Sequence, residues 1–258
     1  LNTWDACGDV PRVVLGSPVA GIAKDEIIDA TPAIRKIQEI VTNEEFQNLP
    51  RKFKTAISGN ARQDVVHEIN DLAFIGVEHP ELGPGFECYV GGGLSTNPML
   101  AQSLGAFVAL EQVPEVWAGV VRIFRDYGYR RLRNRTRLKF LVAKWGVSKF
   151  REVLENEYLG YALPDGPKAP TNLIDRDHIG VHEQRDGNVY VGVKPTLGHM
   201  SGEQLIEVAE LVERYGSTSM RFTPFKELLV LNIDPARVET LQADLENLGL
   251  YSKPSEFR

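Results

Sequence analysis

The tetrad Arg51-Lys52-Phe53-Lys54 is the sharpest cluster of chemically active side chains in the sequence. It stands at the entry of an expected strand, where alternation sends Lys52 and Lys54 to one face and Phe53 to the other. Two ammonium groups on one surface repel each other unless an anion lies between them or one amine loses its proton. Such a pair is suited to binding a small oxyanion and supplying it with protons. For the tetrad taken alone, a solvated strand end is the simpler interpretation.

A glycine-rich turn is the second candidate, and it reads Gly91-Gly92-Gly93-Leu94-Ser95-Thr96-Asn97. Glycines lack Cβ, so their backbone N–H groups can approach a ligand closely. A helix expected near residues 99–104 would add a field that favours negative charge. The turn is therefore a candidate cradle for a carboxylate or phosphate. Its spacing departs from the common nucleotide-binding glycine motifs, and a plain tight turn is the alternative.

The third candidate is Arg12, which follows Pro11 in the turn that begins at Cys7. Because the proline fixes its own φ angle, the arginine is held in place and could bind an anion through two hydrogen bonds. An ion pair with an acidic neighbour such as Asp9 is the alternative for this residue.

Basic residues are concentrated between Arg122 and Arg151, in a chain whose net charge is −6. The overall charge argues against a general nucleic-acid binder. Most members of the stretch are expected to lie on solvated helix faces. A non-catalytic module that binds anions or nucleic acid through residues 122–151 is the competing hypothesis for the whole chain.

The composition, with 43% hydrophobic and 25% charged residues, is that of a globular protein with a sizeable core. Two cysteines and five histidines show no metal-ligand spacing, so no metal ligand is predicted in this chain. No apolar run has membrane-spanning length and the first residues lack signal-peptide features, which predicts a soluble, cytoplasmic protein. Because the sequence starts without methionine, we expect a fragment.

The first part of the chain alternates strand and helix patterns. Pro32 at the start of a helical repeat, with Thr31 as its expected N-cap, predicts one helix, and Ser148 is expected to cap another. These elements predict a mixed sheet flanked by helices, in a domain that spans residues 1–165. The expected helices are 31–43, 114–127 and one from 148, and the expected strands are 53–57, 72–77 and 86–90.

The second part follows a stretch, 163–175, whose proline, glycine and polar residues suggest a linker. Asp186-Gly187 between two apolar runs is a strong hairpin signal. The order ββαββα predicts a compact α+β module over residues 176–258, with helices on one face of an antiparallel sheet. The expected strands are 179–184, 189–193, 220–222 and 228–231, and the helices are 202–215 and 235–248.

Four motifs, in this order, resemble those of the sirohaem-dependent nitrite and sulfite reductases. In that family a sirohaem iron, bridged by a cysteine thiolate to a 4Fe-4S cluster, passes six electrons to nitrite or sulfite and gives ammonium or sulfide. Ferredoxin is the expected electron donor, and the second part of the chain would be one ferredoxin-like half-domain. The similarity covers essentially the whole chain. The motifs are Cys7–Arg12, Leu49–Lys54, Gly91–Thr96 and Tyr129–Lys139.

The resemblance implies roles for the candidate residues. Arg12, Lys52 and Lys54 would surround the substrate anion, with the lysines helping to supply protons. Sirohaem carries eight carboxylate side chains, which require arginines and N–H donors. Part of the Arg130–Arg137 run would also bind them. The other expected cofactor-binding residues are Arg51, Gly91, Gly92, Gly93, Ser95 and Thr96.

Two departures from the family pattern bear on activity. The four cluster cysteines are expected beyond Arg258, after an ending, 253–258, that resembles the segment just before them. An upstream ferredoxin-like repeat is also expected to be missing, so this chain should not catalyse by itself. Lys226 stands where many members have glutamine, which weakens the case for a sirohaem contact there.

Overall fold

The structure, a computed structural model, describes residues 7–171 and 176–254. The opening residues, part of the expected linker and most of the ending that resembles the segment before the cluster ligands lie outside that range. None of the helices in the described part combines the length and the apolarity that a bilayer crossing requires. The chain divides into two compact units, Leu1–Gly21 with Glu26–Leu173 and Ile22–Asp25 with Ile174–Arg258.

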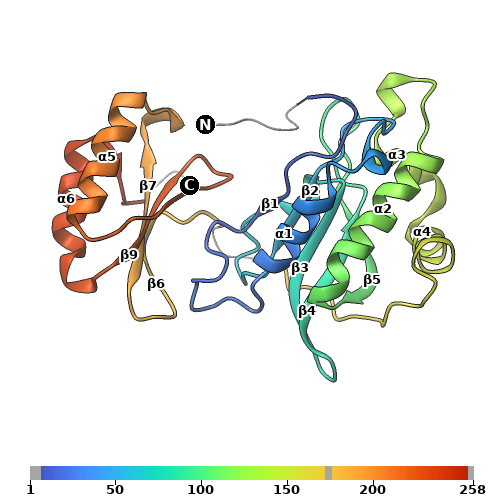
Figure 1. Cartoon of the computed structure of the whole chain (residues 1–258), viewed down its shortest axis with the longest axis horizontal. Helices are drawn as coiled ribbons and strands as arrows, with labels where there is room; N and C mark the ends of the chain where they lie inside the picture. The colour runs from blue at the N-terminus through green and yellow to red at the C-terminus, as the bar shows by residue number, and fades with distance from the viewer. Residues whose placement is uncertain (1–6, 172–175, 255–258) are drawn as a thin grey trace. The chain divides into compact units, whose positions relative to one another are not determined.

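The first unit contains a five-stranded sheet and four α-helices, the last of which runs into a π-helical turn, Leu154–Leu159 (Figure 1). Its strands are β1 (Leu15–Gly16), β2 (Thr55–Ser58), β3 (Leu72–His79), β4 (Gly83–Val90) and β5 (Gln102–Val108). Its helices are α1 (Thr31–Ile40), α2 (Val113–Tyr127), α3 (Leu138–Trp145) and α4 (Val147–Val153).

The strands of this sheet follow the order β1-β2-β3-β4-β5. β1, β2 and β3 run parallel, whereas β4 and β5 are antiparallel to their neighbours. The predicted mixed sheet with helices is therefore confirmed. All four strand residues of β2 are buried, as expected for a strand covered on both faces.

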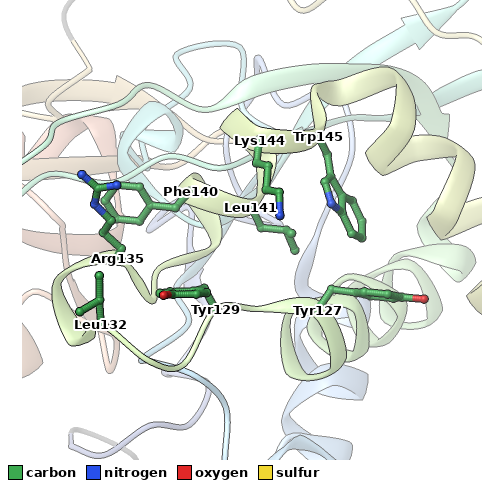
Figure 2. Close-up of a pocket in the computed structure, with 8 residues that line it drawn as sticks. All are labelled: Tyr127, Tyr129, Leu132, Arg135, Phe140, Leu141, Lys144 and Trp145. Atoms are coloured by element: carbon green, nitrogen blue, oxygen red, sulfur yellow. The ribbon is translucent and has the colours of Figure 1, made fainter.

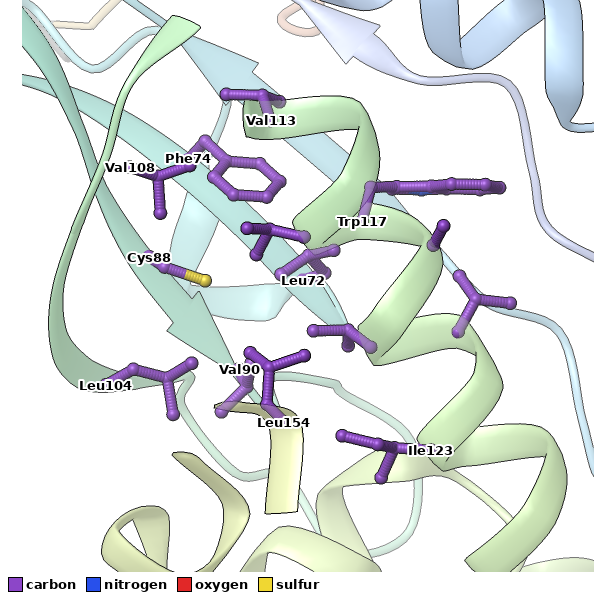
Figure 3. Packing of buried hydrophobic residues seen from close by; sticks show 14 of the residues in the cluster. Leu72, Phe74, Cys88, Val90, Leu104, Val108, Val113, Trp117, Ile123 and Leu154 are labelled. Carbon is purple, nitrogen blue, oxygen red and sulfur yellow. The ribbon is translucent and has the colours of Figure 1, made fainter. Parts of the chain in front are cut away.

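The helices of the first unit pack on one face of its sheet. Alternate residues of the strands, among them Leu72, Phe74 and Cys88, meet apolar residues of α2 such as Trp117 (Figure 3). The indole N–H of Trp117 donates to Thr55 Oγ1 at 3.0 Å, which satisfies its polar atom inside the core. This core fixes the positions of β2, β3 and β4, and therefore also the positions of the residues that directly precede or follow these strands.

Coil covers the opposite face, including part of the expected linker. The backbone N–H of Gly166 donates to the carbonyl of Gly105, and Gln63 donates to the carbonyl of Pro170. The N–H of Ala169 donates to the carboxylate of Glu87, which is buried in β4. Residues 164–170 are thus part of the first unit, although their composition suggests a linker. The functional division at residues 165 and 176 stays a prediction.

Three local expectations for the first unit are wrong. Residues 102–108 form β5 instead of continuing a helix from residue 99, because antiparallel pairing with β4 outweighs local helix preference. Thr31 lies inside α1, and its N–H donates to Asp29 Oδ1 at 2.8 Å. Ser148 lies inside α4, whose N-cap is Gly146 with a φ of 74°.

The second unit has the predicted ββαββα order, extended by one short strand. Its antiparallel sheet has the order β10-β7-β9-β8, with β6 also paired to β7. Gly187 adopts a φ of 87° in the predicted hairpin. The strands are β6 (Gly180–Glu183), β7 (Val189–Pro195), β8 (Met220–Phe222), β9 (Leu228–Ile233) and β10 (Leu250–Tyr251), and the helices are α5 (Gly202–Arg214) and α6 (Val238–Asn247).

Both helices of the second unit lie on the same side of its sheet (Figure 1). The alternate residues Val189, Val191 and Val193 of β7 face them and form a separate hydrophobic core. The expected arrangement, with helices on one face of an antiparallel sheet, is therefore confirmed.

Candidate functional site

Three sequence-distant segments meet at one edge of the first sheet. Lys54 directly precedes β2, Asp71 directly precedes β3, and Gly91 directly follows β4. Because β2 and β3 are parallel, their first residues lie at the same edge. β4 is antiparallel to β3 and pairs Val90 with Leu72, so its last residues lie there too. The fold thus places two of the predicted motifs side by side.

The turn that carries Arg12 belongs to the same edge. Its backbone N–H donates to the carbonyl of Phe53 at 2.7 Å, and Phe53 N–H donates to the carbonyl of Val10 at 3.2 Å. The guanidinium of Arg12 donates to the carbonyls of Cys7, Val10 and Gly8 at 2.9 to 3.3 Å. It does not pair with Asp9, so that alternative is wrong. The Arg12 guanidinium therefore stabilises its own turn, and its binding of an anion stays a prediction.

The alternation expected for the lysine tetrad is present. Phe53 is fully buried and packs against Phe124, with ring centroids 5.9 Å apart, whereas Lys52 and Lys54 are half-buried. Burial is the main cause that lowers the pKa of the Lys54 ammonium. The charges of Arg137 and Lys52 lower it further, while that of Asp71 raises it. Lys54 therefore holds its proton less firmly than an exposed lysine does.

This pKa shift predicts that Lys54 opposes folding at neutral pH. The folded-state pKa lies below the ordinary value of 10.5, so the unfolded chain binds more protons between those two values and stability rises with pH there. Below the folded-state pKa the penalty is complete. We expect Lys54→Met to raise Tm at pH 7, by about 2–4 °C for each kcal/mol of penalty relieved. Thermal unfolding of both proteins at pH 7 and at pH values approaching 10.5 measures this difference in Tm. A difference that does not shrink as the pH rises would contradict the prediction.

Asp71 is the anchor of this edge, and the sequence interpretation missed it. Its carboxylate has no exposed surface and accepts three hydrogen bonds from Arg137, at 2.8 to 3.0 Å. It also accepts the backbone N–H of Lys54 at 2.9 Å. Burial raises the pKa of Asp71, whereas Arg137 and the Lys54 N–H lower it. With donors on both oxygens, the ionised form fits the site best.

The glycine turn does not form the predicted cradle of N–H groups. All three glycine amides are used inside the protein: Gly91 donates to Asp71 O, Gly92 to Asn70 O and Gly93 to Met99 O, at 2.8 to 2.9 Å. No helix follows the turn, so the expected helix field is absent as well. The glycines serve close packing instead, and Ser95 and Thr96 are exposed. Whether the turn contacts a cofactor stays a prediction.

The buried side chain of Lys139 anchors the loop that follows these glycines, residues 94–97. It is almost fully buried in α3, and its ammonium donates to the carbonyls of Gly93, Leu94 and Asn97 at 2.5 to 3.2 Å. Loop carbonyls are therefore drawn inward, toward Lys139. The basic run thus contributes one residue, Arg137, to Asp71 and another, Lys139, to the glycine turn.

Gly92 allows a test of how tightly the turn is packed. A Cβ at this position would lie 2.4 Å from Glu68 O and 2.5 Å from Asn70 O, which are backbone atoms and cannot move easily. We expect Gly92→Ala to lower the free energy of unfolding by about 1–3 kcal/mol. Gly93→Ala is the matched control, because the nearest atoms to its Cβ are side-chain atoms of Arg137 and Lys139 at 3.1 to 3.5 Å, and no backbone atom lies as close as at Gly92. Equal losses in chemical denaturation would refute the packing argument.

Five of the eleven basic residues between Arg122 and Arg151 form ion pairs within the first unit. Arg51 and Arg133 both bind Asp9, at 3.3 and 3.1 Å. Partial burial raises the pKa of Asp9, but the hydrogen bonds and charges of these two arginines lower it further, so the pKa lies below its usual value. Arg122 binds Glu45, and Arg151 binds Glu155 and Asp165. These ion pairs reduce the number of cations that the competing nucleic-acid hypothesis can use.

An open cleft of about 460 Å³ lies between the end of α2 and α3 (Figure 2). Tyr127 and Trp145 pack edge to face in its wall, with ring centroids 5.0 Å apart. The side chains of Arg135 and Lys144 line it without a hydrogen bond or ion pair to any described residue. The other lining residues are Tyr129, Leu132, Phe140 and Leu141.

No group of three or more His, Cys, Asp or Glu residues that could hold a metal ion occurs in the described ranges, 7–171 and 176–254. Cys88 is buried in the core and Cys7 is exposed in its turn. The edge site offers the cationic side chains of Lys52 and Lys54 instead, and such groups favour anions as ligands.

Two family descriptions match the chain, one for each unit. "Nitrite and sulphite reductase 4Fe-4S domain" matches residues 7–162. "Nitrite/Sulfite reductase ferredoxin-like half domain" matches residues 182–248. Together the two matches account for most of the chain.

Individual proteins of both specificities are similar to it. A Mycobacterium tuberculosis protein named sulfite reductase (ferredoxin) is 56% identical over 259 residues, which is 100% of this chain and 46% of that protein. An assimilatory ferredoxin-dependent nitrite reductase of Haloferax mediterranei is 34% identical over 95% of the chain and 44% of that protein. The solved structure of M. tuberculosis NirA superposes with a TM-score of 0.94 over 97% of this chain and 46% of its own. The chain thus spans about half the length of these relatives.

Proposed function

Since the chain belongs to the nitrite and sulphite reductase family, we propose that it supplies the anion-binding part of a ferredoxin-dependent reductase that converts nitrite to ammonium or sulfite to sulfide. The proposal rests chiefly on one observation. Lys52, Lys54 and the turn of Arg12 lie at a single sheet edge, where Asp71 already balances the charge of Arg137. A doubly charged or singly charged oxyanion would neutralise this concentration of positive charge.

The residues of this edge fit a polycarboxylate cofactor such as sirohaem. Arg51 and Arg133 share the single carboxylate of Asp9, and the side chain of Arg133 is 67% exposed. Two guanidinium groups thus share one carboxylate, and an incoming carboxylate can pair with the positive charge that remains. We propose that Arg51, Arg133 and the exposed Ser95 and Thr96 bind sirohaem carboxylates. When bound, sirohaem with its linked 4Fe-4S cluster would supply the electrons.

The cluster itself does not fit the described residues. One buried and one exposed cysteine cannot provide four thiolates. We propose that other segments of a longer polypeptide provide the cluster ligands and the site where ferredoxin delivers electrons. The chain as given would then bind anions without turning them over.

The substrate chemistry requires protons at the anion, because the oxygen atoms of nitrite or sulfite leave as water. Lys52 and Lys54 would hold the anion by charge, and the ammonium Nζ of Lys54 would donate a proton to a leaving oxygen. A lowered pKa makes that donation easier than from an exposed lysine. Because the neighbouring Phe53 is buried, strand alternation directs both amines to the opposite face, where the anion would bind.

The deciding experiment expresses this chain within a polypeptide of the full length of its relatives and assays that protein anaerobically. We expect absorption of a bound tetrapyrrole, and reduction of nitrite, sulfite or both with reduced ferredoxin. A preparation that carries the full cofactor set but reduces neither anion would overturn the proposal. Comparison of kcat/KM for the two anions assigns the physiological substrate.

A further inference from the structure

The cleft between the end of α2 and α3 is separate from the edge site, because Lys52, Lys54, Asp71 and Arg137 do not line it. Its volume of about 460 Å³ lies within the range of about 300–1,000 Å³ that is typical of small-molecule sites. All of its walls belong to the first unit, so the cleft is formed within one compact body. Figure 2 shows the side chains that line it.

Aromatic rings form much of the walls. α3 contributes Phe140 and Trp145, and the end of α2 with the residues after it contributes Tyr127 and Tyr129. Trp145 packs against Tyr127 and Phe150, with ring centroids 5.0 and 6.2 Å apart, so its ring is held in place. Tyr127 and Tyr129 are nevertheless 44% and 45% exposed. Exposed aromatic side chains that gather in one concave place are typical of a binding site.

Two cations, Arg135 and Lys144, lie beside these rings. Both residues are exposed, and neither side chain forms a hydrogen bond or ion pair with any residue that the structure describes. None of the eight residues that line the cleft is acidic. The nearby Arg133 differs, because it binds Asp9. The cleft therefore carries positive charge that its own lining does not neutralise.

These two features together define the chemistry of the ligand. A bare anion would pair with the cations but leave the rings in contact with water. A neutral aromatic molecule would cover the rings but leave the cations without a partner. A ligand with an aromatic ring and an acidic group satisfies both features. The guanidinium of Arg135 is itself attracted to aromatic faces, so the two kinds of contact support each other.

We propose that this cleft binds a small planar aromatic molecule that carries an acidic group, either a carboxylate or a phosphate. The ring packs against Tyr129, Phe140 and Trp145, and the acidic group accepts hydrogen bonds from Arg135 and Lys144. This binding does not depend on the reductase activity proposed above, and nothing in it requires a cofactor.

The cations around the cleft favour a small molecule over a nucleic-acid strand. A strand gains its affinity from a row of cations along successive phosphates, whereas only two cations line this cleft. Arg122, Arg125 and Arg133 of the same basic stretch already bind carboxylates of the protein.

Isothermal titration of the 258-residue chain with 2-naphthoate tests the proposal. We expect saturable binding with a Kd at or below about 1 mM. 2-Naphthalenemethanol lacks the acidic group and should bind at least about 3-fold more weakly, because the charge pairing is lost. Cyclohexanecarboxylate lacks the aromatic ring and should bind at least about 5-fold more weakly, because stacking is lost. Absence of binding by 2-naphthoate, or equal binding by either analogue, would overturn the proposal.

Adenosine monophosphate distinguishes the two acidic groups, because it presents a planar ring and a phosphate. A Kd below that of 2-naphthoate would assign the cleft to phosphates, and a higher Kd would assign it to carboxylates. A single-stranded oligonucleotide that binds more tightly than both, with an affinity that falls steeply with salt, would favour nucleic acid and reject the small-molecule proposal.

Two pairs of variants locate the site. Arg135→Ala and Lys144→Ala should each weaken 2-naphthoate binding about 2- to 5-fold, as expected for single exposed charges, and the double variant about 10-fold. The matched controls are Arg131→Ala, in the same loop as Arg135, and Lys36→Ala, on α1. Both remove exposed cations that do not line the cleft, so both should bind normally. Wild-type affinity in the double variant would place any binding elsewhere and reject this cleft.

Discussion

Replacing Lys54 by alanine in the cofactor-loaded reductase is expected to lower kcat about 100-fold or more, since general acid catalysis contributes factors of about 10² to 10⁴. Lys54 is half-buried, and its pKa is lowered mainly by that burial, so alanine removes a proton donor that gives up its proton more easily than an exposed lysine does. Lys52→Ala should also lower turnover, chiefly by raising KM, because Lys52 contributes charge at the same face. Steady-state kinetics with nitrite and sulfite measure both effects.

The control for this prediction separates chemistry from cofactor loss. Lys36→Ala removes an exposed lysine from α1 and should leave kcat and KM unchanged. Tetrapyrrole absorbance should be the same in Lys54→Ala as in the wild type, because its backbone N–H still donates to Asp71. Unchanged kinetics in both lysine variants would remove them from the substrate site. A loss of activity in proportion to lost cofactor would assign them to cofactor binding instead.

Replacing Asp71 by alanine is expected to cause the largest loss of stability, about 3–5 kcal/mol in the free energy of unfolding. The variant leaves the guanidinium of Arg137, only 13% exposed, without its carboxylate, and it leaves the Lys54 N–H without its acceptor. Chemical denaturation monitored by circular dichroism measures the change. The turn of Gly91 should loosen as well, because its N–H donates to the carbonyl of Asp71.

Asp165→Ala is the matched control, because it also removes a carboxylate from an arginine. Asp165 is 91% exposed, so its ion pair with Arg151 should contribute at most about 1 kcal/mol. In the double variant Asp71→Asn with Arg137→Met, no unpaired charge remains, and part of the lost stability should return. If Asp71→Ala costs no more than Asp165→Ala, the buried pair is not the anchor of this edge.

The fold class could be predicted from the sequence, because hydrophobic periodicity and turn chemistry agree along most of the chain. The second unit has the expected ββαββα order, and α2 begins within one residue of its predicted start. The helix expected at 99–104 was wrong since the segment pairs with β4, a contact that no local pattern encodes. The caps at Thr31 and Ser148 were also wrong, because helix ends depend on tertiary packing as well as on residue type.

The candidate site could be predicted only in outline. The spacing of Lys52, Phe53 and Lys54 gave the correct faces, since strand alternation is a local property. Arg137 matters more than its basic neighbours because its guanidinium reaches Asp71, and the density of charge along the sequence carries no such information. The polar pair Asn70-Asp71 before an apolar strand was the available signal. A carboxylate placed just before a buried strand must find donors nearby.

The packing of residues 164–170 has a practical consequence for anyone who divides this protein. Glu87 lies in β4 under that segment and receives hydrogen bonds from Tyr89, Ser103 and the backbone N–H of Ala169. A truncation at residue 165 would take away one of those donors and uncover the sheet face that holds Ala73 and Ile75. The exposed face would then be a surface prone to self-association. Cloning boundaries should therefore fall after Pro170, whose carbonyl accepts a hydrogen bond from Gln63 of the first unit.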